Sequence, residues 1–79
     1  MKNVNDYVDI ILAELNTVKK GKKFIVKDFF RGIDWNEIPI GVRLNIGSAF
    51  LVAAQSETNK KIIKILPKNS ANQQMYQKK

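Results

Sequence analysis

The segment from residue 60 to residue 79 constrains the fold more than any other part of this chain. Its sequence, KKIIKILPKNSANQQMYQKK, holds two short strand-forming runs at residues 62–66 and 73–77, joined by turn-prone residues at 67–72. A two-stranded hairpin is only marginally stable alone in water, so these runs need a further strand or a helix to pack on. The segment predicts a β-hairpin with a long loop that the rest of the chain supports.

A run of strand-forming residues earlier in the chain, Phe24-Ile25-Val26, supplies the missing partner. It follows a KKGKK sequence that is typical of an exposed turn. All three residues favour strands, but three residues are too few to form a sheet by themselves. We therefore expect residues 24–26 to form a strand that pairs with the C-terminal hairpin.

The N-terminal half of the chain predicts two helices. Apolar residues at helical spacing indicate a first helix over residues 4–18, with Asn3 or Asn5 as its N-cap and the sequence KKG at residues 19–21 as its end. A second, short helix is expected at residues 27–31, with Gly32 as its C-terminal stop. Residues 33–35 would then form a connection, in which Trp35 belongs to the core.

A third helix is expected from about residue 36 to residue 56, with Pro39 in its first turn. Its helical wheel separates two faces. The face expected to pack on the body of the protein carries Arg43, Ile46, Gly47, Phe50 and Ala54. The opposite face is small and mostly uncharged, and it carries Gly41, Asn45, Ser48, Val52 and Gln55. The pattern predicts a helix that is anchored on one side and open to a partner on the other.

Length and composition exclude most catalytic chemistry. Seventy-nine residues form a single domain, residues 1–79, with little room for a deep cavity. The chain has no cysteine and no histidine, which removes thiolate and imidazole metal sites and histidine-based triads. It also has no phosphate-cradling glycine loop. We therefore expect no enzyme activity, no catalytic residues, no metal and no cofactor.

The N-terminal segment carries Asp6, Asp9 and Glu14 among its apolar residues. A signal peptide or a membrane span would not tolerate these acids well. Asp6 and Asp9 could suggest a metal or acid–base site, but acids at a helix N-terminus are explained by the helix dipole. These residues predict a cytoplasmic protein without a membrane partner.

The positive charge is concentrated in the second half of the chain. The net charge is +7, and residues 41–79 contain seven Lys or Arg residues against a single acid, Glu57. A field of this sign attracts polyanions, because bound lysines and arginines release the counterions of a nucleic acid. A lysine-rich surface that only aids solubility is the alternative that charge alone leaves open.

The expected DNA contacts come from the third helix and from the hairpin. On the helix they are Gly41, Arg43, Asn45 and Ser48. Before and on the hairpin they are Lys60, Lys61, Lys64, Lys68, Asn69, Ser70 and Asn72. Asparagine and serine side chains can hydrogen-bond base edges or phosphates, and lysines can contact phosphates. Two roles stay open for Arg43, which can contact a phosphate or form an ion pair with Asp34 or Glu37.

The order helix, short strand, helix, helix, strand, turn, strand resembles that of the winged helix-turn-helix superfamily, over almost the whole chain. The sequences KFIVKDFFRGIDWNEIP and GVRLNIGSAF also look like a family of small, largely uncharacterised proteins of Gram-positive bacteria and their mobile elements. The resemblance implies a mainly α-helical α+β fold with three helices and a C-terminal two-stranded wing. Residues 39–56 would be the recognition helix and residues 68–72 the tip of the wing.

These observations support three functions, of which binding of double-stranded DNA leads. In that function a dimeric regulator of transcription, of plasmid maintenance or of a mobile element places the third helix in the major groove and the wing along the phosphates. The second is a protein-interaction module that uses a surface around Leu44 and Leu51, which could also be a dimer contact. The third is a binder of single-stranded nucleic acid, which needs exposed aromatic residues, and Tyr7 and Tyr76 are the expected ones.

Overall fold

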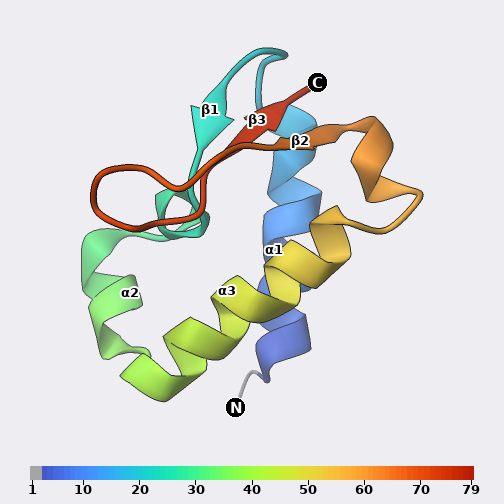
Figure 1. The fold of residues 1–79 in the computed structure, drawn as a ribbon. Coiled ribbons are helices and arrows are strands. Elements are labelled where there is room, and N and C mark those ends of the chain that lie inside the picture. Colours follow the sequence, from blue (N-terminus) through green and yellow to red (C-terminus); the bar gives the residue numbers. More distant parts are fainter. Residues whose placement is uncertain (1–2) are drawn as a thin grey trace.

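The structure is a computed structural model that describes residues 3–79. It is an α+β fold with three α-helices and a small antiparallel sheet of three strands in this range (Figure 1). Three short 3-10 turns, labelled η, connect these elements. The order along the chain is α1 (Val4–Glu14), η1 (Leu15–Thr17), β1 (Lys23–Phe24), η2 (Val26–Phe29), α2 (Gly32–Glu37), α3 (Ile40–Ala54), η3 (Asn59–Lys61), β2 (Ile63–Ile65) and β3 (Tyr76–Lys78).

The first helix begins with a reciprocal cap. The Asn3 side chain accepts a hydrogen bond from the Asp6 N–H at 2.9 Å, and the Asp6 carboxylate accepts one from the Asn3 N–H at 3.0 Å. Such a capping pair satisfies two backbone donors and stabilises a helix by about 1 kcal/mol. The predicted N-cap is confirmed at Asn3, and the Asp6 carboxylate has a structural role.

The sheet has the strand order β1-β3-β2, so the strand latest in the sequence lies in the centre. Phe24 of β1 and Ile65 of β2 both lie opposite Tyr76 of β3. The predicted pairing of residues 24–26 with the hairpin is therefore confirmed at Phe24, although Ile25 and Val26 leave the ladder. The return strand is shorter and later than the predicted residues 73–77, because β3 forms only where both neighbouring strands are available to pair with it.

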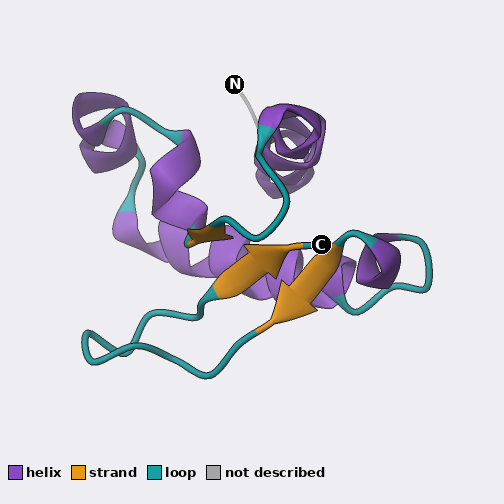
Figure 2. Cartoon of the chain, turned by 90° about the horizontal axis from the view of Figure 1, so that it is seen from above, coloured by secondary structure: helices purple, strands orange, loops and turns teal. Residues whose placement is uncertain are grey.

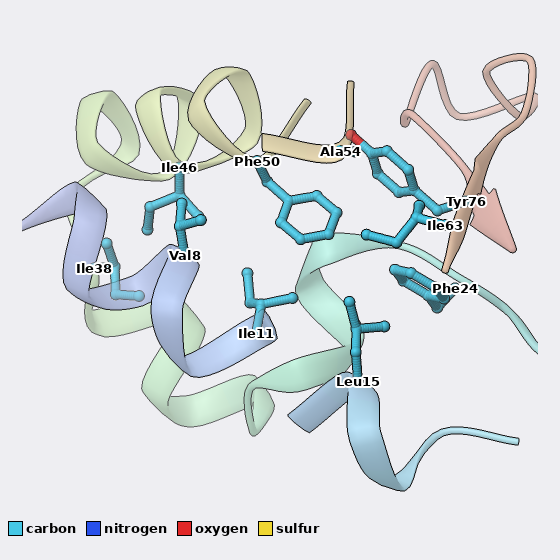
Figure 3. Close-up of a cluster of buried hydrophobic side chains, with 10 residues drawn as sticks. All are labelled: Val8, Ile11, Leu15, Phe24, Ile38, Ile46, Phe50, Ala54, Ile63 and Tyr76. Atoms are coloured by element: carbon cyan, nitrogen blue, oxygen red, sulfur yellow. The ribbon is translucent and has the colours of Figure 1, made fainter. Parts of the chain in front are cut away.

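The core lies between α1, α3 and the inner face of the sheet. Its ten buried residues are Val8, Ile11, Leu15, Phe24, Ile38, Ile46, Phe50, Ala54, Ile63 and Tyr76 (Figure 3). The helices α1 and α3 pack against one another, and the sheet lies over the C-terminal part of α3 (Figure 2). The rings of Phe24, Phe50 and Tyr76 meet at this junction, with 4.9 Å between the centroids of Phe50 and Tyr76.

A contact between the sheet and the end of the first helical segment ties the C-terminal strand to the N-terminal part of the chain. The Lys78 ammonium donates a hydrogen bond to the Leu15 carbonyl oxygen at 2.5 Å. The Leu15 carbonyl oxygen also accepts a hydrogen bond from the Val18 N–H at 3.1 Å. Carbonyl groups at a helix C-terminus carry partial negative charge, so a lysine there is stabilising.

The predicted position of the second helix is wrong. Residues 26–29 form only the 3-10 turn η2, and Gly32 begins α2 instead of ending a helix. The expected connection at residues 33–35 is therefore helical. The Arg31 Nε donates to the Asp34 Oδ2 at 2.8 Å across the first turn of α2, and this interaction raises the pKa of the Arg31 guanidinium. Trp35 packs half-buried against the core, beside Phe30, as expected.

The expected exposure of Tyr76 is also wrong, because its side chain is 1% exposed. Its register opposite Phe24 and Ile65 directs the ring into the core. The hydroxyl has no hydrogen-bond partner among the described residues. Burial, which disfavours the charged phenolate, raises the pKa of Tyr76 to about 12. Tyr7 is half-buried against Phe30, so neither tyrosine is a free stacking platform.

These features predict that Tyr76→Phe stabilises the protein by about 1 kcal/mol, because it removes a buried hydroxyl that lacks a partner. The folded pKa of about 12 exceeds the unfolded value of about 10, so only the unfolded state loses its proton between them. The contribution of Tyr76 to the free energy of unfolding is therefore fully present below pH 10. It falls by about 2–3 kcal/mol as the pH rises towards 12. Urea unfolding at a series of pH values measures it.

The Tyr76→Phe variant should lack this alkaline decrease, while Tyr7→Phe should retain it because Tyr76 is still present. A lower stability of Tyr76→Phe at neutral pH would show that the hydroxyl makes a favourable interaction in solution.

Candidate nucleic-acid interface

The α3 helix presents an uncharged face to solvent. Gly41, Asn45, Ser48 and Val52 are exposed, whereas Ile46, Phe50 and Ala54 on the other side are buried. The predicted packed face is confirmed at Ile46, Phe50 and Ala54, whereas Arg43 and Gly47, which were expected on it, are only half-buried. The exposed face combines small residues with two side chains that can hydrogen-bond, so another molecule can approach the helix backbone closely.

The loop between β2 and β3, residues 66–75, has an ordered hydrogen-bond pattern centred on Asn69. The Asn69 Oδ1 accepts hydrogen bonds from the N–H groups of Ala71 and Gln73, each at 3.0 Å. Its Nδ2 donates to the Gln73 Oε1 at 3.1 Å. Asn72 adopts a left-handed backbone with φ of 62°, a conformation that asparagine tolerates better than most residues. Asn69 thus shapes the loop and is half-buried, which leaves Lys68 and Ser70 exposed at the tip.

The base of this loop is held by a glutamine. The Gln74 Nε2 donates a hydrogen bond to the Leu66 carbonyl oxygen, and the Leu66 N–H donates to the Met75 carbonyl oxygen at 3.0 Å. These bonds close the loop on itself before β3 begins. The loop extends past β1 to the side of the molecule where α2 lies (Figure 1).

A groove of about 350 Å³ separates this loop from α3. One wall is the flank of α3, with Arg43, Leu44, Gly47, Ser48 and Leu51, and the other includes Lys68, Asn72, Gln73 and Gln74. Lys27 of η2 and Trp35 of α2 also line the groove, and the apolar or aromatic residues Ile25, Val26 and Tyr76 complete the lining. Three lining residues, Lys27, Arg43 and Lys68, are positively charged, and no Asp or Glu lines the groove. The arrangement favours an anionic partner.

Arg43 is half-buried in this groove. Its guanidinium carbon lies 6.0 Å from the centroid of the Trp35 ring, and its Nε is buried without a hydrogen-bond partner among residues 3–79. The ion pairs between described residues do not include the expected pair of Arg43 with Asp34 or Glu37, and the Asp34 carboxylate pairs with Arg31. A cation in this position is stabilised by the aromatic ring and retains hydrogen-bonding capacity for a ligand oxygen.

The structure brings together some of the predicted contacts and separates others. Arg43, Ser48, Lys68 and Asn72 line the groove, and Gly41 and Asn45 lie on the adjoining exposed face of α3. The lysines Lys60, Lys61 and Lys64 lie outside the groove. Lys60 contacts Glu57 at 3.5 Å on the far side of β2, and Lys64 is on the sheet itself. The predicted lysines at residues 60–64 therefore do not share the groove with Lys68.

Among the groove residues with a charged or amide side chain, the sequence did not predict Lys27, Gln73 and Gln74 as contacts. Lys27 was assigned to a helix, and nothing in its neighbourhood in the sequence indicates that η2 turns it toward the loop. Gln73 and Gln74 were assigned to the return strand, which begins later. Only the long-range packing of η2 and the loop beside α3 defines these positions.

Other kinds of site are not found in the part of the chain that the structure describes. Residues 3–79 contain no group of three acidic residues close enough to hold a metal ion. None of the helices in the same range combines the length and the apolar character that a membrane span requires.

Comparison with known proteins gives a family match. Residues 9–78 match the family model described as "Domain of unknown function (DUF1413)". No curated protein and no solved structure matches the chain. The match extends from α1 to β3, so it includes α3, the loop and the groove between them.

Proposed function

We propose that this chain, which belongs to the DUF1413 family, is a winged helix-turn-helix protein that binds double-stranded DNA and acts as a small regulator of transcription or of a mobile element. Support for the fold comes from the element order and from the strand order β1-β3-β2, in which the first strand joins the hairpin. Only Ile38 and Pro39 separate α2 from α3, which makes these helices the helix-turn-helix pair. The loop 66–75 is the wing.

The proposed recognition element is the exposed face of α3. The helix has 15 residues and is therefore about 22 Å long, and the major groove of DNA is wide enough to admit it. Gly41 permits close approach, while Asn45 and Ser48 can hydrogen-bond base edges and Val52 can contact a thymine methyl group. Because these groups are few, we expect a moderate preference among DNA sequences.

The phosphate contacts are assigned to the cations around the groove. Lys68 on the wing, Lys27 on η2 and Arg43 on α3 surround the flank of the proposed recognition helix. A duplex whose major groove holds α3 has a sugar–phosphate backbone beside each flank of the helix, and these cations lie along one of those flanks. The single observation that carries the proposal is this groove, with three cations and no carboxylate in its lining.

The test is fluorescence anisotropy of a random-sequence duplex and of duplexes from the region upstream of the gene, over a series of salt concentrations. Three phosphate contacts predict a slope of log K against log salt of about −2.7, at about −0.9 per contact. Tighter binding to the upstream duplex would support a regulator. Failure to bind either duplex at low salt would exclude DNA as the partner.

One observation favours a second function, a protein-interaction module on the same scaffold. Ile40 and Leu44 lie one turn apart on α3, and each is 68% exposed. Adjacent exposed apolar residues are typical of protein contacts. Leu51, expected to share this surface, is half-buried and packs partly against the core, so the exposed apolar pair is shifted toward the N-terminal end of α3.

For this second function, we expect Ile40→Ser/Leu44→Ser to abolish a protein contact. The change removes most of the apolar area on this part of α3 and leaves the core intact. Sedimentation of the purified protein detects self-association, and a pull-down detects another protein. Loss of either contact, with DNA affinity within about twofold of the parent, would support the module, whereas a monomeric parent without a partner would exclude it.

A further inference from the structure

The outer face of the sheet carries a second basic surface. Lys23 of β1 and Lys64 of β2 both lie opposite Gln77 of β3, so the three residues form a row across the sheet. Residues in register share a face, and alternate residues along a strand face opposite sides. Because Phe24 and Tyr76, the neighbours in the next row, are buried in the core, the row of Lys23, Gln77 and Lys64 faces away from it.

Neither lysine of this row forms an ion pair with another residue of the range 3–79. Their backbones are two strand spacings apart, about 10 Å, and both residues are exposed. The ion pairs between described residues are Arg31 with Asp34 and Lys60 with Glu57, so neither involves Lys23 or Lys64. Placing like charges on one face costs free energy, which an anionic partner would offset.

This surface is separate from the groove beside α3. None of the three residues in the row lines the groove, and the groove is reached from the side of the sheet where Tyr76 packs. Figure 2 shows the sheet in front of α3, so that its outer face is turned away from that helix. One protein molecule therefore presents cations in two directions.

We propose that the outer face of the sheet binds the phosphate backbone of a second DNA duplex, so that the protein bridges two duplexes. The inference rests on the proposed function, because the first duplex is held at α3. The row contains no aromatic side chain on which single-stranded bases could stack and no apolar side chain that could enter a membrane. Its two lysines match a duplex backbone, which offers charged oxygens without requiring a stacking surface, and the Gln77 amide between them donates to the Gly21 carbonyl oxygen at 3.0 Å.

The experiment measures capture of a second duplex. The full chain is added, below saturation, to an immobilised duplex, and retention of a fluorescent duplex of the same random sequence is recorded. The wild type should retain it. In Lys23→Gln/Lys64→Gln the retention should be lost, or its salt slope reduced by about 1.8, as expected for two phosphate contacts. The affinity for a single duplex, measured by anisotropy, should change by less than about twofold, because the α3 surface is intact.

Two control variants separate position from charge. Asn5→Asp/Ala13→Glu on the exposed side of α1 gives the same net charge as Lys23→Gln/Lys64→Gln and should still bridge. Lys23→Arg/Lys64→Arg keeps the charges in place and should also bridge. Circular dichroism checks that each variant is folded.

Each other outcome has a distinct meaning. A wild type that binds no duplex at all excludes the proposed function, and the bridging inference with it. A wild type that binds one duplex without retaining a second overturns the bridging inference alone. Retention by Lys23→Gln/Lys64→Gln equal to that of the wild type overturns it as well, and would assign bridging to self-association of the protein. Equal loss in the α1 control would show that only net charge matters, which also overturns it.

Discussion

The Phe50→Ala variant should be largely unfolded at 25 °C. Phe50 is completely buried, and its ring lies 4.9 Å from that of Tyr76 and 6.4 Å from that of Phe24. Truncation of a buried phenylalanine costs about 3–5 kcal/mol, from lost apolar burial and from the cavity left behind. A domain of this length has a stability of only roughly 3–5 kcal/mol. The change therefore removes most or all of the free energy of unfolding.

Urea unfolding followed by circular dichroism measures this effect. Phe50→Leu, which retains much of the apolar volume, should cost less and leave the variant folded. Val52→Ala changes the exposed face of the same helix, where the side chain is 68% exposed, and should alter the stability by less than about 0.5 kcal/mol. A Phe50→Ala protein as stable as Val52→Ala would mean that α3 does not pack on the sheet as described.

The Lys27→Glu/Lys68→Glu variant should bind DNA roughly 100-fold more weakly than the parent at physiological salt. The two lysines lie on different walls of the groove beside α3. A hydrogen bond to a charged group is worth about 1.5–3 kcal/mol, so the loss of two such contacts lowers the affinity for DNA by about 100-fold or more. The introduced carboxylates would also repel the phosphates. Anisotropy across a salt series measures both the affinity and the reduced salt slope.

The matched control is Lys19→Glu/Lys20→Glu, which changes the net charge equally in the exposed turn before β1. It should weaken binding much less, because neither residue lines the groove. Equal weakening by the two variants would show that the overall field of the protein, and not the groove, attracts the duplex.

Asn45→Ala, by comparison, should alter the preference among sequences more than the affinity for a random duplex.

The sequence predicted the elements whose signals are local and repeated. The apolar periodicity of residues 4–15 is sustained over several turns, so the first helix was predicted with the correct start, although α1 ends at Glu14 and not at residue 18. The third helix was predicted from about residue 36 to residue 56, whereas α3 begins at Ile40 and ends at Ala54, because residues 36 and 37 belong to α2. The pairing of Phe24 with the hairpin could also be predicted, because residues 24–26 and the two strands of the hairpin are each too short to be stable alone. The exposed face of α3, with Asn45 and Ser48, could be predicted because it mirrors the buried face of the same helix.

The remaining features depend on contacts between distant residues. A single glycine at residue 32 is compatible with either end of a helix. The Arg31–Asp34 pair accompanies the start of α2, but its two residues in the sequence do not by themselves show that a helix begins there. Tyr76 has a polar hydroxyl that suggests exposure, but its pairing with two strands places it in the core. Lys27 reaches the groove only because η2 turns beside the loop, which no local pattern encodes.

The central position of β3 makes the sheet depend on the last strand of the chain. Both β1 and β2 precede Tyr76–Lys78 in the sequence, yet neither pairs with the other. Without β3, neither strand has a partner in the sheet, and Phe24 lacks the ring of Tyr76 that stacks on it. The helices α1 and α3 can associate before β3 is in place, but the aromatic junction closes only when residue 76 docks, so formation of the sheet and closure of the core are one event.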